Sequence, residues 1–213
     1  ARINDILSWT TPFGETRLAT ASSDGSIRLW DPDVGTQVGR SLTGHAGPVR
    51  DMCIFTTRHG DAWLASVGDE GAIRIWDPDA GRQIGRPLKG PACPMTCVAS
   101  FSAANGEPRL VTTGNDYIVR VWDPGTGQRL GRLSSGEENL CDVVLVGTNR
   151  EGRTRLVTSG LDRSIRFWDI ATGRMTYAMH ALDYTETIIS FRYGDLAVNL
   201  DDGWALLRLP LGV

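Results

Sequence analysis

The sequence predicts an all-β fold in which one small antiparallel sheet is repeated along the chain. Three observations lead to this prediction. Four similar strings end in a Trp-Asp or Trp-Asp-Pro sequence, and their tryptophans stand 46 residues apart, at Trp30, Trp76, Trp122 and Trp168. Short apolar or alternating runs are separated by turn-forming residues, and no window has the periodicity of a helix. A unit that buries its apolar face against copies of itself recurs in this way, whereas a catalytic motif does not.

The second unit contains the expected strands in order. They are residues 48–55 (PVRDMCIF), 63–68 (WLASVG), 73–78 (IRIWDP) and 81–88 (GRQIGRPL), and polar, glycine-containing connections separate them. Four such runs joined by short turns predict a four-stranded antiparallel meander.

The same apolar positions recur in the other units, which predicts one register for all of them. Three sets of positions are spaced by 46 residues: Ile3, Val49 and Met95; Leu18, Leu64, Leu110 and Leu156; and Trp9, Phe55 and Phe101. Periodic apolar positions form the core between stacked repeats. We therefore divide the chain, as one domain, into repeats at 1–46, 47–92, 93–138, 139–184 and 185–213.

The fifth repeat is degenerate. Residues 196–210 (LAVNLDDGWALLRLP) align with residues 18–32, which places Arg208 at the tryptophan position and Trp204 at the position of Ser26. The residues that follow Leu209 are too few for a further strand, so we expect this sheet to lack its outer strand.

The composition is typical of one soluble domain. A chain of 213 residues with 41% hydrophobic residues can bury a core, and its apolar runs are far shorter than the roughly 18 residues of a membrane-spanning helix. The net charge of −3 disfavours a nucleic-acid-binding surface, although residues 149–155 (NREGRTR) form a basic hairpin tip. We expect a cytoplasmic protein that binds neither membrane nor nucleic acid.

The sequence predicts neither a metal site nor a cofactor. Its cysteines, Cys53, Cys93, Cys97 and Cys141, lack the paired short spacings of a zinc site and do not occupy equivalent positions in the repeats. We expect reduced thiols. Glycine-rich stretches such as residues 125–131 lack the strand-then-helix setting of a phosphate-binding loop.

The repeated strings resemble the WD-repeat family of β-propellers. They are DGSIRLWDP (24–32), EGAIRIWDP (70–78), DYIVRVWDP (116–124) and DRSIRFWDI (162–170), each preceded by a strand that contains Ser or Thr. The resemblance covers nearly the whole chain and implies a β-propeller of four-stranded blades, with about five blades present.

In this family a hydrogen-bond chain within each blade links a histidine, a Ser or Thr hydroxyl, the tryptophan and an acidic turn residue. By position the second repeat offers all four, as His45, Ser66, Glu70 and Trp76. The first, third and fourth repeats offer three each: Thr20, Asp24 and Trp30; Thr112, Asp116 and Trp122; and Thr158, Asp162 and Trp168. Pro91 and Glu137 stand at the histidine position of the third and fourth repeats, and His180 is a candidate for the fifth.

His45, Ser66 and Glu70 also have the residue types of a hydrolytic triad. The equivalent positions lack histidine in otherwise intact repeats, so the sequence favours a structural network. We assign no catalytic residue.

The resemblance also implies a partner-binding face. In the family, the upper face of the ring is lined by a variable residue inside each first strand and by the residue before the acidic turn residue. Carried over by position, these are Asn4, Arg50, Thr96 and Asp142, with Ser23, Asp69, Asn115 and Leu161. Such mixed polar residues suit a protein or peptide partner.

Trp63 is a further candidate anchor for a partner. It stands where the other repeats have arginine, which predicts that it is exposed; packing against its own hairpin is the alternative.

The absent outer strand, together with a first-repeat histidine that would precede Ala1, predicts that the chain is the C-terminal part of a longer ring of seven blades. The alternative is a five-bladed assembly that closes through a second copy or keeps a three-stranded edge. An unpaired strand edge invites self-association.

The leading functional prediction is a non-enzymatic scaffold for protein–protein interaction. Arginine supplies 21 of the 22 basic residues, which is typical of a GC-rich genome, and GRQIGRPLKG (81–90) resembles repeats of multidomain bacterial proteins. We therefore predict part of a bacterial signalling or regulatory protein. A small-ligand or glycan-binding propeller is the alternative, although it would require similar polar residues in every repeat; an enzyme is the third class.

Overall fold

The computed structural model describes residues 1–133, 140–148, 154–160, 164–180, 185–190, 195–200 and 203–208. Side chains are described for residues 1–133, 156–159 and 164–178.

The described strands form five antiparallel sheets that follow one another along the chain. The first sheet contains β1 (Ile3–Thr10), β2 (Thr16–Ser22), β3 (Ser26–Asp31) and β4 (Thr36–Thr43). The second contains β5 (Val49–Thr56), β6 (Ala62–Gly68), β7 (Ala72–Asp77) and β8 (Arg82–Lys89). The third contains β9 (Met95–Ser102), β10 (Pro108–Gly114), β11 (Val119–Trp122) and β12 (Arg129–Leu133).

The fourth sheet contains β13 (Leu140–Thr148), β14 (Thr154–Gly160), β15 (Ser164–Asp169) and β16 (Arg174–His180). The fifth contains three strands among the described residues, β17 (Thr185–Ser190), β18 (Asp195–Leu200) and β19 (Gly203–Arg208). Within each sheet, strands that are consecutive in the sequence pair with each other.

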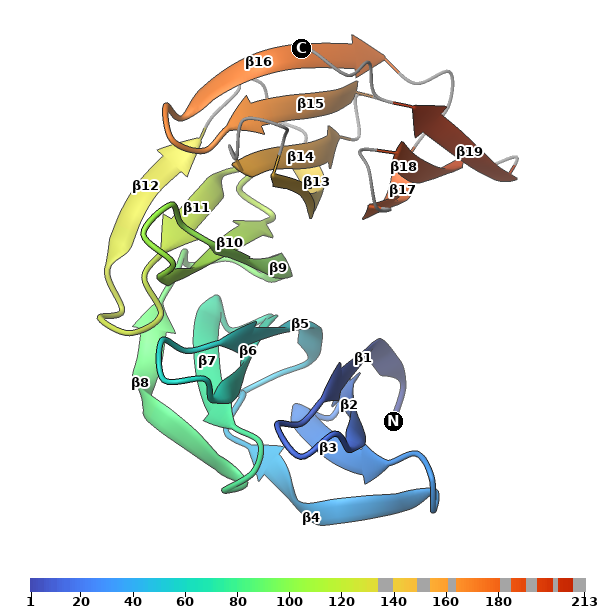
Figure 1. Cartoon of the computed structure of the whole chain (residues 1–213), viewed down its shortest axis with the longest axis vertical. Helices are drawn as coiled ribbons and strands as arrows, with labels where there is room; N and C mark the ends of the chain where they lie inside the picture. Colours follow the sequence, from blue (N-terminus) through green and yellow to red (C-terminus); the bar gives the residue numbers. More distant parts are fainter. Residues whose placement is uncertain are drawn as a thin grey trace.

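The five sheets are arranged in an open arc (Figure 1). The first strand of each sheet lies on the inner side of the arc, and β4, β8, β12 and β16 lie on its outer side. Successive first strands contact one another, from β1 to β5, β9, β13 and β17. The predicted fold class is confirmed: the chain is all-β and its sheets are propeller blades, which here form part of a ring rather than a closed one.

The repeated tryptophans share one register in the first four sheets. Each pairs across the sheet with the repeated leucine of the second strand: Leu18 with Trp30, Leu64 with Trp76, Leu110 with Trp122, and Leu156 with Trp168.

The prediction for the fifth sheet was wrong by one residue. Leu196 pairs with Leu207, so Leu207 occupies the tryptophan position and Arg208 pairs with Asp195. Trp204 pairs with Asn199, as Ile27 pairs with Ala21 in the first sheet. An ungapped alignment misses this shift because the connection between β18 and β19 is shorter, and a shift of one residue moves every side chain to the other face.

The core lies between the sheets. Ala19, Ile27 and Leu29 of the first sheet pack against Met52 and Trp76 of the second. Equivalent clusters join the second sheet to the third and the third to the fourth. Since burying one large apolar side chain contributes about 1.5–3 kcal/mol, each sheet is held mainly by its neighbours.

Candidate functional site

Six of the predicted face residues gather at one end of the first three sheets, which we call the upper end. Asn4, Arg50 and Thr96 each follow the first residue of an inner strand, and Ser23, Asp69 and Asn115 directly follow the second strands. Because these strands are antiparallel, the start of one lies beside the end of the other. The side chains of Asp142 and Leu161 lie outside the described residues.

At the upper end, Asn4 links the first two sheets. Its Nδ2 donates a hydrogen bond to the carbonyl oxygen of Val49 over 2.7 Å, and its Oδ1 accepts one from Ser23 Oγ over 3.0 Å. Both ends of the amide are therefore used within the protein, which fixes its orientation.

Arg50 and Asp69 form a bidentate ion pair. Arg50 Nε lies 2.6 Å from Asp69 Oδ1, and Arg50 Nη2 lies 2.9 Å from Asp69 Oδ2. The hydrogen bond with Asp69 raises the pKa of the guanidinium further, so Arg50 stays charged. The pair takes two of the five N–H donors of the guanidinium, and the remaining three face away from Asp69.

Thr96 and Asn115 complete the group from the third sheet. The two hydroxyls of Thr96 and Thr113 lie 3.4 Å apart, and the backbone N–H of Asn115 donates to the carbonyl oxygen of Pro94 over 2.9 Å. The Asn115 amide forms no side-chain hydrogen bond within the part of the chain that the structure describes.

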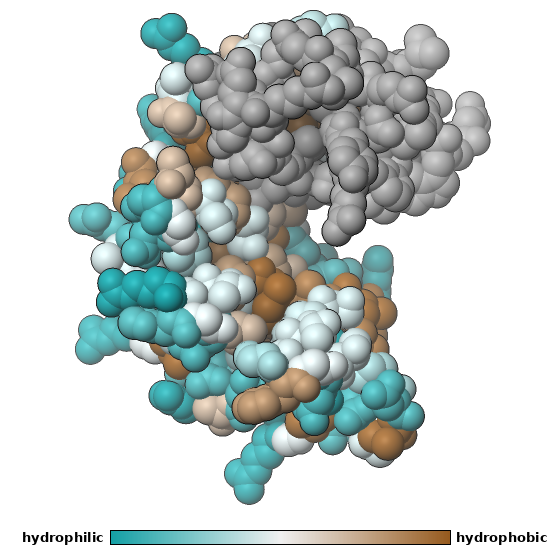
Figure 2. All heavy atoms as spheres, in the orientation of Figure 1, coloured by the Kyte–Doolittle hydropathy of each residue, from teal (hydrophilic) through white to brown (hydrophobic). Residues whose placement is uncertain are grey.

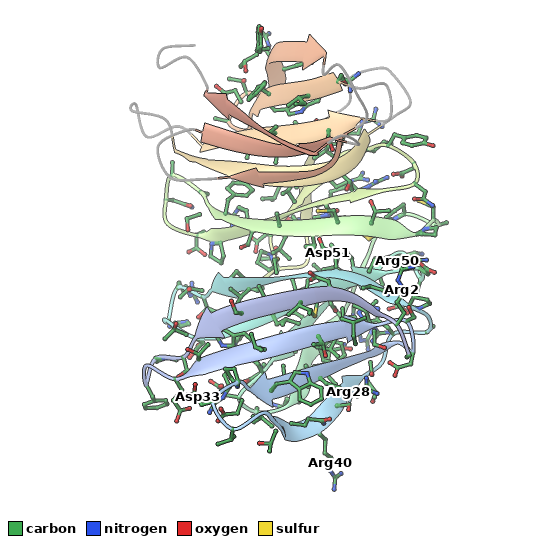
Figure 3. The ribbon with its side chains drawn as sticks, turned by 90° about the vertical axis from the view of Figure 1, so that its right-hand side faces the viewer. Arg2, Arg28, Asp33, Arg40, Arg50 and Asp51 are labelled. Carbon is green, nitrogen blue, oxygen red and sulfur yellow. The ribbon has the colours of Figure 1, made fainter. Side chains whose placement is uncertain are left out.

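A pocket of about 380 Å³ opens at the upper end of these sheets. In Figure 3, Arg2 and Arg50 lie close together at the same edge of the molecule. The lining residues are Arg2, Asn4, Arg50, Pro94, Thr96 and Asn115. Sequence reasoning missed Arg2 and Pro94. In the sequence, their position directly before the first strand of a sheet was the one signal that could have identified them.

The structure does not bring Trp63 to this pocket. Trp63 lies near the start of β6, at the opposite end of the sheet from Asp69, and pairs with Phe55 of β5. Their ring centroids are 6.3 Å apart in an edge-on arrangement, and Trp63 is partly buried. The prediction that Trp63 is exposed was therefore wrong, and the alternative, packing against its own hairpin, is what the structure shows, because the large ring packs on its cross-strand neighbour.

The four residues predicted as a network in the second repeat are in contact. Trp76 Nε1 donates to Ser66 Oγ over 2.8 Å, and Ser66 Oγ lies 2.7 Å from His45 Nε2. His45 Nδ1 lies 2.8 Å from Glu70 Oε1. Because Ser66 Oγ accepts the Trp76 N–H, it can donate its own proton to Nε2, which places the imidazole proton on Nδ1, next to Glu70 Oε1.

Two titratable groups in this network have shifted pKa values. Burial lowers the pKa of His45 from 6.5 to about 4, which the charge of Arg74 reinforces and Glu70 opposes. Burial alone would raise the pKa of Glu70, but hydrogen bonds from Arg74 and from the Ala46 N–H, with the charges of His45 and Arg74, bring it below its usual value. His45 is therefore neutral at pH 7.

The other described sheets have a shorter version of the network. The tryptophan Nε1 donates to a threonine hydroxyl over 3.0 Å between Trp30 and Thr20, and over 2.9 Å in the third and fourth sheets, between Trp122 and Thr112 and between Trp168 and Thr158. Asp162 and the side chain of His180 lie outside the described residues.

In each of the first three sheets an arginine pairs with the acidic turn residue, including the second sheet, where Arg74 Nε lies 2.7 Å from Glu70 Oε1 beside His45. Asp24 pairs with Arg28 over 2.9 Å, and Asp116 pairs with Arg120. Hydrogen bonds from Ser26 and then Arg28 lower the pKa of Asp24. Sequence reasoning missed this partner, although the signal was present: arginine recurs two residues before every repeated tryptophan, at positions 28, 74, 120 and 166.

The comparisons with known proteins agree with this geometry. The family model described as WD domain, G-beta repeat matches residues 3–31 and 36–77, which cover the first sheet and most of the second. Over these two ranges, about a third of the chain, the sequence is similar to WD repeats. No curated protein matches the chain.

In this chain, the hydroxyl that a hydrolytic triad would need is unavailable. Ser66 is fully buried, and its oxygen is enclosed between the Trp76 indole and the His45 ring. A nucleophile must reach its substrate, so these residues stabilise the blade and do not form a triad.

Carboxylates on the inner strands also link the first sheet to the second and the second to the third. Asp5 Oδ2 accepts a hydrogen bond from the Met52 N–H over 3.0 Å, and Asp51 Oδ2 accepts one from the Val98 N–H over 2.7 Å. The side chains of Asp5 and Asp51 are themselves hydrogen-bonded, and the Cys97 thiol is a further partner of Asp51. Burial and the neighbouring charge of Asp5 raise the pKa of Asp51 to about 7.

Within the described residues, no group of three or more His, Cys, Asp or Glu side chains is placed to hold a metal ion. Cys53, Cys93 and Cys97 are not in disulfides; Cys141 lies outside the described side chains. Among the described residues, there is also no helix with the length and apolar character needed to cross a membrane.

Proposed function

We propose that this chain is a non-enzymatic scaffold that binds a protein or peptide partner at the upper end of its blades. WD repeats generally mediate interactions between proteins. The observation that carries the proposal is the pocket between the first three sheets, because its polar side chains come from equivalent positions of separate repeats yet converge on one space.

The chemistry of the pocket supports a protein partner. Its lining supplies guanidinium, amide and hydroxyl groups, which suit the backbone and polar side chains of a peptide. Among the described residues that line it, no aromatic side chain offers a surface on which a sugar ring could stack. We place the chain in a cytoplasmic signalling or regulatory protein of a bacterium, which the arginine-rich composition favours.

Affinity capture from extracts of the source cells would test the proposal. The wild-type chain should retain a partner that the Arg50→Ala/Asp69→Ala double variant binds at least about tenfold more weakly. The double variant removes both side chains of the ion pair at once, so neither charge is left without its partner.

Arg40→Ala is the matched control, because Arg40 is exposed on β4 and points away from the body at the outer rim (Figure 3). Purified partner and chain should reproduce the difference in direct binding measurements. Equal binding by the wild type and the double variant would show that the upper-end pocket is not the binding site.

A further inference from the structure

We propose that the upper-end pocket binds a side-chain carboxylate from an acidic segment of the partner, with Arg2 and Arg50 as its two cationic contacts. The inference rests on the proposed function and specifies the chemistry of the partner. The charges of Arg2 and Arg50 support it, as do the hydrogen-bond donors that Arg2, Arg50 and Asn115 leave unused within the described residues.

Among the described residues, Arg2 supplies a positive charge that no carboxylate pairs with. Its side chain forms no ion pair or hydrogen bond within the described residues, and the residue is exposed. The backbone beneath it is held, however, because the Arg2 carbonyl oxygen accepts hydrogen bonds from the Ser23 N–H over 2.9 Å and from Ser22 Oγ over 3.3 Å. The guanidinium therefore projects from a fixed point beside the pocket (Figure 3).

Arg50 supplies a second guanidinium that is already oriented. Asp69 holds one edge of it through two hydrogen bonds, so the opposite edge keeps its N–H donors for a ligand. Asp69 is in this sense a positioning residue, because it fixes the planar group before a ligand arrives. Less side-chain entropy is then lost on binding.

The charge sum of the pocket fits a single negative charge. Arg2 and Arg50 carry two positive charges, and Asp69 neutralises one of them. The remaining lining side chains, Asn4, Thr96 and Asn115, are neutral. A carboxylate would balance the remaining charge, whereas a phosphate, with nearly two negative charges at pH 7, would leave an excess.

The neutral residues fit the rest of an acidic side chain and its backbone. The Asn115 amide has both donor and acceptor unused within the described part of the chain. Asn115 directly follows β10 of the third sheet, whereas Arg2 directly precedes β1 of the first, and both line the pocket. A planar carboxylate between two guanidinium groups and a neighbouring amide is a strong, directional arrangement.

Selection from a random peptide display library on the purified chain tests the proposal. Wild-type protein should enrich peptides that share one Asp or Glu position, and changing that acid to Asn or Gln should weaken binding about tenfold. Arg2→Gln should cause a similar loss. The two changes should not add when combined, because either one removes the same contact.

Arg40→Gln is the control, since it removes an exposed arginine outside the pocket and should leave binding unchanged. Thermal unfolding of each variant should match the wild type, which separates loss of a contact from loss of fold. Binding should also weaken as salt is raised.

Three outcomes would overturn the carboxylate proposal. In the first, the wild type and Arg2→Gln bind the selected acidic peptide equally well. In the second, the peptide binds more tightly when phosphoserine replaces the acidic residue. In the third, the peptides selected by the wild type share no acidic residue. If selected peptides lack an acid but lose binding in the Arg50→Ala/Asp69→Ala variant, the carboxylate inference fails while the proposed function stands.

Discussion

At the scale of single residues, one hydroxyl oxygen distinguishes the second blade from the others. Ser66 Oγ serves both Trp76 and His45, whereas Thr112 Oγ1 serves Trp122. The resemblance to the WD-repeat family implied these hydroxyl–tryptophan contacts, because a Ser or Thr and a tryptophan stand at the family's positions in these repeats. It did not predict the arginine partners of the turn carboxylates, since the family pattern directed attention to histidine.

Ser66→Ala should therefore destabilise the chain more than Thr112→Val. The first change leaves two buried groups, the Trp76 N–H and His45 Nε2, without a partner, while the second leaves the Trp122 N–H alone. At about 1–3 kcal/mol for each unsatisfied buried group, the difference between the variants should be of that order. Urea denaturation at pH 7 measures it, and equal losses would mean that the hydrogen bond to His45 contributes nothing.

At the scale of elements, neighbouring inner strands are joined by carboxylates as well as by packing. Asp5 and Asp51 occupy equivalent positions in β1 and β5, and Cys97 occupies that position in β9. Each aspartate accepts a backbone N–H from the next inner strand. The sequence could not show this, because a hydrogen bond between sheets depends on how closely the inner strands approach.

Relative to the wild type, the Asp51→Asn variant should be more stable at pH 8 than it is at pH 5. The pKa of Asp51 is raised from 3.8 to about 7 in the folded chain, so its contribution to stability is present below pH 3.8 and is lost as the pH rises through 7. Asparagine can still accept the Val98 N–H, and it carries no charge beside Asp5.

The difference in unfolding free energy between Asp51→Asn and the wild type should therefore change in favour of the variant by more than about 1 kcal/mol between the two pH values. His45, whose pKa is lowered, gives stability that is lost as the pH falls, but it is common to both proteins and cancels. Asp33→Asn, at an exposed turn, is the control and should show no such change. A pH-independent difference for Asp51→Asn would contradict the raised pKa.

At the scale of the whole molecule, each blade has two apolar faces, and the first sheet exposes one of them. Ile6, Met52 and Val98 occupy equivalent positions, but they are 63%, 4% and 3% exposed. Met52 and Val98 are covered by the preceding sheet, whereas the β1–β4 sheet faces the viewer uncovered in Figure 3. Figure 2 accordingly shows hydrophobic side chains on the surface in this part of the arc.

The repeat spacing predicted which positions are apolar, since every blade is built to the same pattern. It could not predict which copies of a position are covered, because burial depends on the neighbouring blade and not on the residue. Ile3 illustrates the difference: it is 43% exposed, while its equivalents Val49 and Met95 are fully buried.

This asymmetry predicts different costs for the same change at equivalent positions. Met52→Ala should lower the free energy of unfolding by about 2–5 kcal/mol, because it removes buried contacts and leaves a cavity between the first two sheets. Ile6→Ala should cost less than about 1 kcal/mol, because the isoleucine is mostly in contact with water. Denaturant unfolding at several protein concentrations would measure both. A cost for Ile6→Ala that approaches that of Met52→Ala would mean that the face of the first sheet is covered in solution. If that cost grew with protein concentration, the cover would be a second copy of the chain, since only association depends on concentration.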